Sequence, residues 1–153
     1  MNFTKTIVLT VILASMALFV SALGEGRDMC TTSFTEGLID GYAMENTEGS
    51  VSGIMHLPKQ VGSIEVKAVG TSNLGEKITL EGTTKFSSIV QHDGYFVLQG
   101  YTVMLTVIEG NARMGLPNVA TEVYFHPKDD IVYVIYDNQY LEETRLLFSG
   151  GCN

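Results

Sequence analysis

The residues with the widest chemical repertoire in this 153-residue chain are three histidines and two cysteines. The histidines, His56, His92 and His126, lie far apart in the sequence, so no two of them have the short spacing of a metal-binding motif. The carboxylates likewise lack the regular spacing of a calcium-binding loop. The sequence therefore predicts no metal site and no cofactor.

Motifs for covalent catalysis and for phosphate binding are also missing. The chain has neither the glycine loop of dinucleotide-binding proteins nor a Walker-type loop. Residues 49–53 have two glycines at the spacing of a nucleophile elbow, but Val51 stands where that motif requires serine. None of the 17 acidic side chains lies in a segment whose pattern requires burial. We therefore predict no catalytic residue and find no ground for an enzymatic function.

The remaining side chains suit apolar ligand binding best. Aromatic and methionine side chains line the interiors of small barrels that hold apolar ligands. The candidates for such a lining are Tyr95, Phe96, Tyr101, Met104, Tyr133 and Tyr136, with Met55 and Met114 as adaptable parts of the wall. The alternative is that these side chains form plain core, because a small barrel can be filled by its own residues.

Short β-strands separated by turns must position these side chains. Apolar and polar residues alternate over 63–68 and 77–81, which is typical of strands with one buried face. Further strands are predicted over 34–43, 51–57, 85–90, 95–108, 119–125 and 131–136. Asp93-Gly94 predicts a hairpin turn. Because no long helix separates the strands, we predict one antiparallel all-β domain of eight or nine strands. An up-and-down, lipocalin-like barrel is favoured over a β-sandwich.

Two segments stand apart from this pattern. Residues 95–108 exceed the usual strand length of about 5–6 residues, and Gly100 is expected to bend the strand. After Gly100 both faces are apolar, which predicts a strand covered on both sides or an oligomer contact such as a homodimer. The residues expected to share one of these faces are Tyr101, Val103, Leu105 and Val107. Residues 138–149 fit a strand or a helix, and the strand is favoured because a compact turn precedes it.

The N-terminus predicts secretion. Lys5 precedes an apolar run over 7–20, and small residues follow at the expected cleavage position after Ala22 or Gly24. The run is shorter than the roughly 20 residues that a membrane span needs. The expected organisation is a signal peptide over 1–24 and a single secreted β domain over 25–153, with no membrane span in the mature chain.

The two cysteines fit an oxidising compartment. Cys30 stands near the start of the expected mature chain and Cys152 next to its end. An even pair in such a compartment predicts one disulfide, which would tie the termini together. An intermolecular disulfide and a free nucleophilic Cys30 are the alternatives.

The composition excludes several classes of protein. With 45% hydrophobic and 17% charged residues the chain is unlike a disordered one. Its net charge is −8, and loss of residues 1–24 would make it −9 because Lys5 is the charged residue removed. Such an acidic chain is poorly suited to nucleic acid, because affinity for the phosphate backbone depends on basic side chains.

In size, secretion and strand count the chain is similar in outline to lipocalins and avidins. It contains no tryptophan, whereas lipocalins carry an early Gly-x-Trp motif and avidins use tryptophans in their ligand site. The functional prediction therefore rests on fold class alone. It is a secreted β-barrel that binds a small apolar or amphipathic ligand in its interior. The alternative is a non-catalytic, secreted β-sandwich that binds a protein partner.

Overall fold

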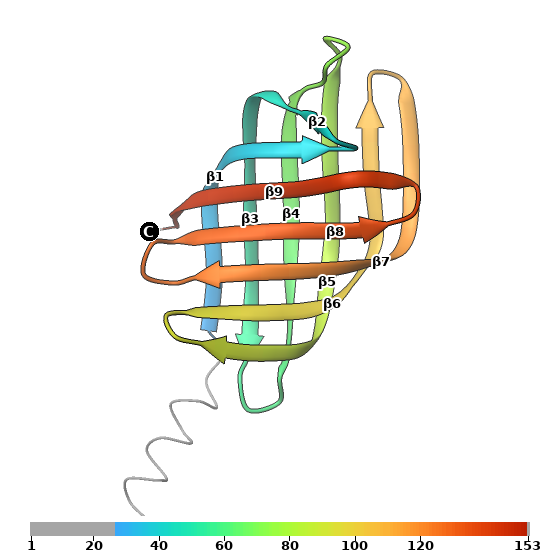
Figure 1. The fold of residues 1–153 in the computed structure, drawn as a ribbon. Coiled ribbons are helices and arrows are strands. Elements are labelled where there is room, and N and C mark those ends of the chain that lie inside the picture. The colour runs from blue at the N-terminus through green and yellow to red at the C-terminus, as the bar shows by residue number, and fades with distance from the viewer. Residues whose placement is uncertain (1–26, 153) are drawn as a thin grey trace, which may run out of the picture.

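A computed structural model of the protein describes residues 27–152, which are almost entirely β-structure (Figure 1). The predicted signal peptide lies outside the described residues. The strands are β1 (Arg27–Ile39), β2 (Tyr42–Ala43), β3 (Glu45–His56), β4 (Val61–Thr71), β5 (Lys77–His92), β6 (Tyr95–Glu109), β7 (Ala112–His126), β8 (Ile131–Asn138) and β9 (Leu141–Gly151).

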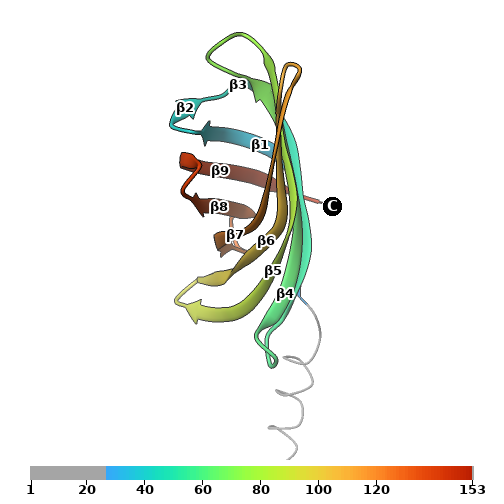
Figure 2. The same ribbon diagram turned by 90° about the vertical axis from the view of Figure 1, so that its right-hand side faces the viewer.

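These strands close into an up-and-down barrel. From β3 to β9 each strand pairs antiparallel with the next in the chain, and β1 pairs with β3 on one side and β9 on the other. The β1–β9 pairing closes the sheet, so eight strands form the wall, while β2 extends it at the end of β1. Figure 2 shows that the barrel is flattened into two facing layers. The prediction of an antiparallel up-and-down barrel is confirmed, and the closed order distinguishes it from the β-sandwich alternative.

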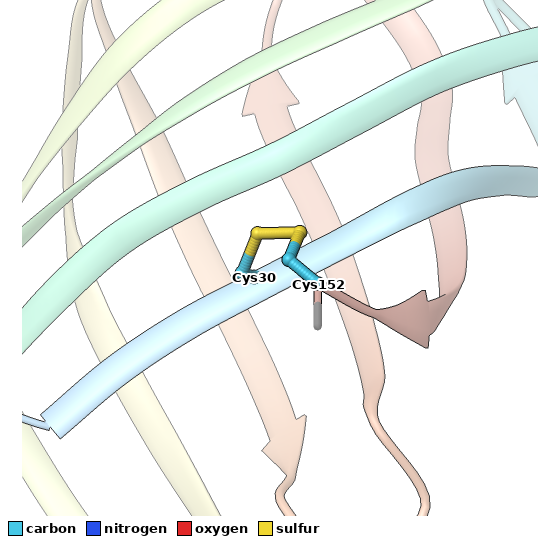
Figure 3. Close-up of a disulfide and its surroundings, with 2 residues drawn as sticks. All are labelled: Cys30 and Cys152. Carbon is cyan, nitrogen blue, oxygen red and sulfur yellow. A yellow bond between two sulfur atoms is a disulfide. The ribbon is translucent and has the colours of Figure 1, made fainter.

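A disulfide between Cys30 and Cys152 lies at the seam where the barrel closes (Figure 3). The two Cα atoms are 5.5 Å apart, although the residues are separated by 122 positions in the sequence. The adjacent residues Thr31 and Gly151 are partners in the β1–β9 ladder. The predicted disulfide is confirmed, and it ties the first wall strand to the last at the point where they meet.

One of the turns between strands was predicted from the sequence, and a second turn was not. The Asp93-Gly94 turn joins β5 to β6, and Gly94 has a φ of 82°, which a glycine adopts without strain. The predicted strand over 34–43 is divided between β1 and β2, because Asp40 and Gly41 both have positive φ and reverse the chain there. A polar residue and a glycine therefore end β1 at Ile39, four residues before the end of the predicted strand.

Two further predictions concern a strand that is longer than expected and a segment that was ambiguous between strand and helix. The predicted strands over 77–81 and 85–90 form one continuous strand, β5, because the backbone stays extended through the residues between them. Over 138–149 the strand alternative is confirmed as β9, whose inner face buries Leu146 and Phe148. Pairing with β8 and β1 on its two sides holds this segment extended despite its helical spacing.

Strand β6 departs from simple alternation after Gly100. Thr102 and Leu105 are buried, whereas Val103 and Met104 between them are both about half exposed, at 48% and 47%. The β5–β6 register shifts at this point, as it does at a β-bulge. The prediction that residues 101, 103, 105 and 107 share one face is therefore wrong, because the bulge exchanges the inner and outer faces midway along the strand.

Apolar side chains fill the centre of the barrel. Every wall strand contributes to the core, and its largest fully buried side chains include Met29, Met55, Ile64, Leu80, Phe96, Leu98, Leu105, Val123, Leu146 and Phe148. Along most strands, buried apolar residues that face the interior alternate with charged and polar residues that face outward. The middle of the barrel is therefore closed by its own side chains, and open space must be sought at its ends or outside.

A chain of threonine hydroxyls crosses this apolar interior. Thr102 Oγ1 lies 2.7 Å from Thr84 Oγ1 and 2.7 Å from Thr121 Oγ1, and Thr121 donates to the carbonyl of Val119. A hydroxyl has one proton, so Thr121 must accept from Thr102, which in turn accepts from Thr84. The hydrogen bonds thus run in one direction across β5, β6 and β7.

Replacing the central member of this chain, Thr102→Val, is expected to destabilise the protein by about 1–3 kcal/mol. Valine keeps the volume of the side chain but leaves the buried hydroxyl of Thr84 without its acceptor. Urea unfolding measures the loss, and Thr83→Val on the exposed outer face is the matched control. Equal stability of Thr102→Val and the wild type would show that the chain contributes nothing.

Candidate functional site

The six predicted ligand-binding residues occupy three different places. Phe96 and Tyr136 face the interior and are 2% and 3% exposed, so they belong to the filled core. Tyr95 and Tyr133 are half-buried on the outer face, between inward-facing neighbours. Tyr101 and Met104 are exposed on the outer face of β6. The structure brings Phe96 and Tyr136 into the core but does not gather the six around one cavity, and their role in binding stays a prediction.

Tyr95 is the centre of an aromatic cluster on the outer face. Its ring stacks against His92 and His126, with ring centroids 5.1 and 5.0 Å away, and Tyr124 lies at 6.4 Å. Tyr133 continues the row beyond Tyr124. The fold thus brings two of the three histidines beside one tyrosine, but they lie against its ring and do not converge on a common point.

A polar group borders this row. Glu122 accepts hydrogen bonds from the Gln99 amide and the Tyr124 hydroxyl. These two hydrogen bonds lower the pKa of the Glu122 carboxyl below its ordinary value. The bond from Gln99 has the larger effect and the bond from Tyr124 the smaller one. The same hydrogen bond to Glu122 raises the pKa of Tyr124 above its ordinary value. These groups satisfy one another across β6 and β7, which is what an outer polar pair does in a sheet.

A hollow with a volume of about 320 Å³ lies at one end of the barrel. We call it the mouth pocket. Its lining includes residues from the end of β1, the short β2, the β4–β5 loop and the two strands of the β6–β7 hairpin. The β4–β5 loop and the β6–β7 hairpin are at the top of Figure 1. Its lining residues are Ile39, Asp40, Tyr42, Ala43, Met44, Ser72, Asn73, Leu74, Ile78, Val107, Glu109, Met114 and Leu141.

Most of this lining is apolar and belongs to the core below. The buried residues Ile39, Met44, Ile78, Val107 and Leu141 form its floor. Around this floor, Tyr42 is 56% exposed and Leu74 is 74% exposed, and both form part of the rim. An apolar floor with exposed apolar side chains at the edge is the usual composition of a small-molecule site in the mouth of a barrel.

Two carboxylates face the mouth pocket, and they differ in their partners. Asp40 is engaged, because its Oδ1 accepts from the backbone N–H of Glu142 and its own N–H donates to Thr144 Oγ1. Glu109 is not, because its Oε1 is inaccessible to solvent and has no hydrogen-bond partner among the described residues. Glu109 is therefore the carboxylate of the lining whose charge is not compensated at Oε1 by any described residue.

The Tyr136 hydroxyl is a second buried group without a partner in the described part of the chain. Tyr136 pairs with Thr144, whose hydroxyl reaches Asp40 at the pocket, so it lies at the same end of the barrel. Burial raises the pKa of this phenol far above the ordinary value of 10.0. It stays protonated and available as a donor throughout the physiological range.

Tyr136→Phe is expected to raise the free energy of unfolding by about 1 kcal/mol at neutral pH, because it removes an unsatisfied buried hydroxyl. Above pH 10 the difference should grow. There the unfolded state loses its Tyr136 proton while the folded state keeps it, so the stability of the wild type falls by about 1.4 kcal/mol per pH unit from this residue. Denaturation at pH 8 and above pH 10 tests both points, and parallel pH profiles for the two proteins would contradict them.

Sequence reasoning missed the mouth pocket and Glu109. The sequence contains a pattern that could have identified Glu109, because every second residue from Leu105 through Val107 to Glu109 faces inward after the bulge. A reader of the sequence who does not know where the bulge lies cannot tell which residues of β6 face inward. Met114, predicted as adaptable wall, does lie in the lining, whereas Met55 is in the closed core.

A larger hollow, of about 700 Å³, is an open groove on the outer face of β3 to β6. It contains a set of residues that we call the neutral patch: Glu65, Lys67, Glu81, Lys85, Val103 and Met104. Lys67 and Glu81 are cross-strand partners, and the two lysines balance the two glutamates. Of its lining residues Val66 alone is buried, whereas the mouth pocket has five buried residues in its floor, so the groove suits a flat partner better than a small molecule.

Fold and site together define an eight-stranded, up-and-down antiparallel barrel with a filled centre and an apolar mouth. No protein-family model matches the chain, and no curated protein or solved structure matches it. Within residues 27–152, no three His, Cys, Asp or Glu side chains are placed to hold a metal ion together. The same residues contain no helix long and apolar enough to cross a membrane.

Proposed function

We propose that this protein is a secreted barrel that binds a small amphipathic molecule in the mouth pocket. The observation that carries the proposal is the combination of a buried apolar floor, an exposed apolar rim and a volume of about 320 Å³. Sites for small organic ligands have volumes of about 300 Å³ and more, with mainly apolar linings. The ligand is placed at the open end of the interior because side chains fill the middle.

Two features support secretion as part of this proposal. The N-terminal residues have the composition of a signal peptide, and the Cys30–Cys152 bond is of a kind that persists in oxidising compartments. A negative net charge keeps such a carrier soluble.

Titration with a neutral apolar fluorophore, N-phenyl-1-naphthylamine, tests the proposal. We expect saturable binding at one site, with the blue shift of a dye that leaves water. Ala43→Trp places an indole in the pocket lining and should weaken binding at least about tenfold, a loss of about 1.4 kcal/mol. Ala120→Trp, on the outer face of β7 and outside the lining, is the matched control. An absence of saturable binding, or equal binding by both variants, would contradict the proposal.

As a second function we propose self-association through the neutral patch. Val103 and Met104 are exposed side by side, and the charges around them cancel on a chain whose net charge is −8. Two acidic copies repel one another over most of their surface, so they approach most easily where the local charge is zero. A twofold contact would place lysines of one copy opposite glutamates of the other.

Sedimentation velocity across a wide concentration range tests the dimer. The wild type should shift from monomer to dimer as concentration rises, and Val103→Glu should stay monomeric because it introduces a charge into the contact. Val90→Glu is the matched control, since Val90 is also 48% exposed but lies outside the patch. A wild type that is monomeric at every concentration would reject this function.

A further inference from the structure

The position of Glu109 is fixed by the end of β6. Leu105 is fully buried and Val107 is 7% exposed, so the third residue in this alternating series also faces inward. Glu109 is the last residue of β6 and pairs with Ile78 of β5, which is itself part of the pocket floor. The carboxylate therefore stands against the apolar floor of the mouth pocket, away from the charged outer face.

The Oε1 atom of Glu109 is a buried hydrogen-bond acceptor. It is shielded from solvent, and no donor from the described residues reaches it. A carboxylate oxygen that is removed from water without a partner destabilises the site, and a hydrogen bond from a charged donor compensates more strongly than one from a neutral donor. A cationic group that enters the pocket beside this carboxylate therefore gains binding free energy that a purely apolar ligand does not.

The charges around the pocket specify the sign of that donor. Asp40 and Glu109 are the ionisable acids in its lining, and the lining contains no lysine, arginine or histidine. The side chain of Glu76 lies beside Gly110, directly after Glu109 in the chain. Two bases adjoin lining residues in sequence, Lys77 beside Ile78 and Arg113 beside Met114. Both bases are exposed on the opposite side of their strands. The local field therefore attracts a cation and repels an anion.

We propose that the mouth pocket selects amphiphiles with a cationic head group, an alkylammonium in chemical terms, whose N–H donates to Glu109 while the apolar body covers the floor. This inference rests on the proposed function of the pocket. It assigns a specificity-determining role to a carboxylate whose Oε1 has no partner among the described residues, and it identifies the ligand class by head-group charge.

Three probes with the same ten-carbon chain test the head group: decylamine, decanol and decanoate. Decylamine and decanoate are used below their micellar concentrations, and decanol below its solubility limit, to displace N-phenyl-1-naphthylamine at pH 7. We expect decylamine to bind about tenfold or more tightly than decanol, and decanoate to bind most weakly. Glu109→Gln should abolish the preference for decylamine over decanol while leaving decanol binding nearly unchanged. Glu48→Gln, which removes the same charge from an exposed site on β3, should keep the preference.

The outcomes separate this inference from the proposed function. If none of the three probes displaces the dye and the dye itself does not bind, the pocket is not a ligand site. If decanol or decanoate binds as tightly as decylamine to the wild type, the pocket binds amphiphiles but the cationic preference is wrong. That comparison needs no variant, so it holds even where Glu109→Gln fails to fold. A folded Glu109→Gln protein that keeps the preference would overturn the role of Glu109.

Discussion

Replacing both Cys30 and Cys152 with serine is expected to lower the free energy of unfolding by about 4–5 kcal/mol. The bond closes a loop that spans a sequence separation of 122, and so removes much conformational freedom from the unfolded chain. Cys30 is half-buried and Cys152 is exposed, so little packing is lost with the sulfur atoms. For a domain of this size the melting temperature should fall by on the order of 15 °C. Calorimetry and guanidinium unfolding measure both quantities.

The reduced wild type is the control for this prediction. It keeps both side chains, so it should unfold at the same denaturant concentration as the double serine variant if loop closure is the cause. The single variant Cys30→Ser is unsuitable, because it leaves Cys152 free to form intermolecular bonds. Identical midpoints for the oxidised and reduced wild type would refute the loop-closure account, since the seam would then be held entirely by the β1–β9 ladder.

The barrel fold could be predicted from the sequence, because strands and tight turns are specified by residues that are close together in the chain. Alternation over 63–68 and 77–81 reflects the two faces of each strand, and the Asp93-Gly94 pair specifies a tight hairpin by its own backbone preferences. The disulfide follows from counting, because two cysteines allow one intramolecular pairing. Antiparallel order follows in turn, since short turns join only strands that run in opposite directions.

The mouth pocket could not be predicted from the sequence, because it depends on how the sheet closes. Its lining comes from β1, β2, the β4–β5 loop, β5, β6, β7 and β9, and only the register of the closed barrel brings these ends together. The bulge at Val103 and Met104 compounds the difficulty, because it reverses which residues of β6 face inward. Tyr101 and Met104 were expected in the interior on the basis of residue type, yet they are exposed. Residue type does not reveal such an insertion in a stretch where apolar residues occupy both faces.

Truncation of one core aromatic, Phe148→Ala, is expected to cost about 3–5 kcal/mol. Phe148 is fully buried on β9, is in register with Val132 on β8 and Phe34 on β1, and its ring centroid lies 5.1 Å from that of Phe34. Alanine would leave a cavity at the seam that the closed wall cannot collapse to fill. Urea unfolding measures the loss, and Tyr140→Ala in the exposed β8–β9 turn controls for the removal of an aromatic ring.

The position of Phe148 makes this variant a test of closure as well as of packing. The Phe34–Phe148 contact and the Cys30–Cys152 bond both join β1 to β9, one by burial and the other by a covalent bond. When the disulfide is absent, loss of Phe148 should open the seam and lower the cooperativity of unfolding, so the two changes should not be additive. A combined variant whose loss equals the sum of the separate losses, with an unchanged denaturant slope, would show that the seam is held independently at its two points.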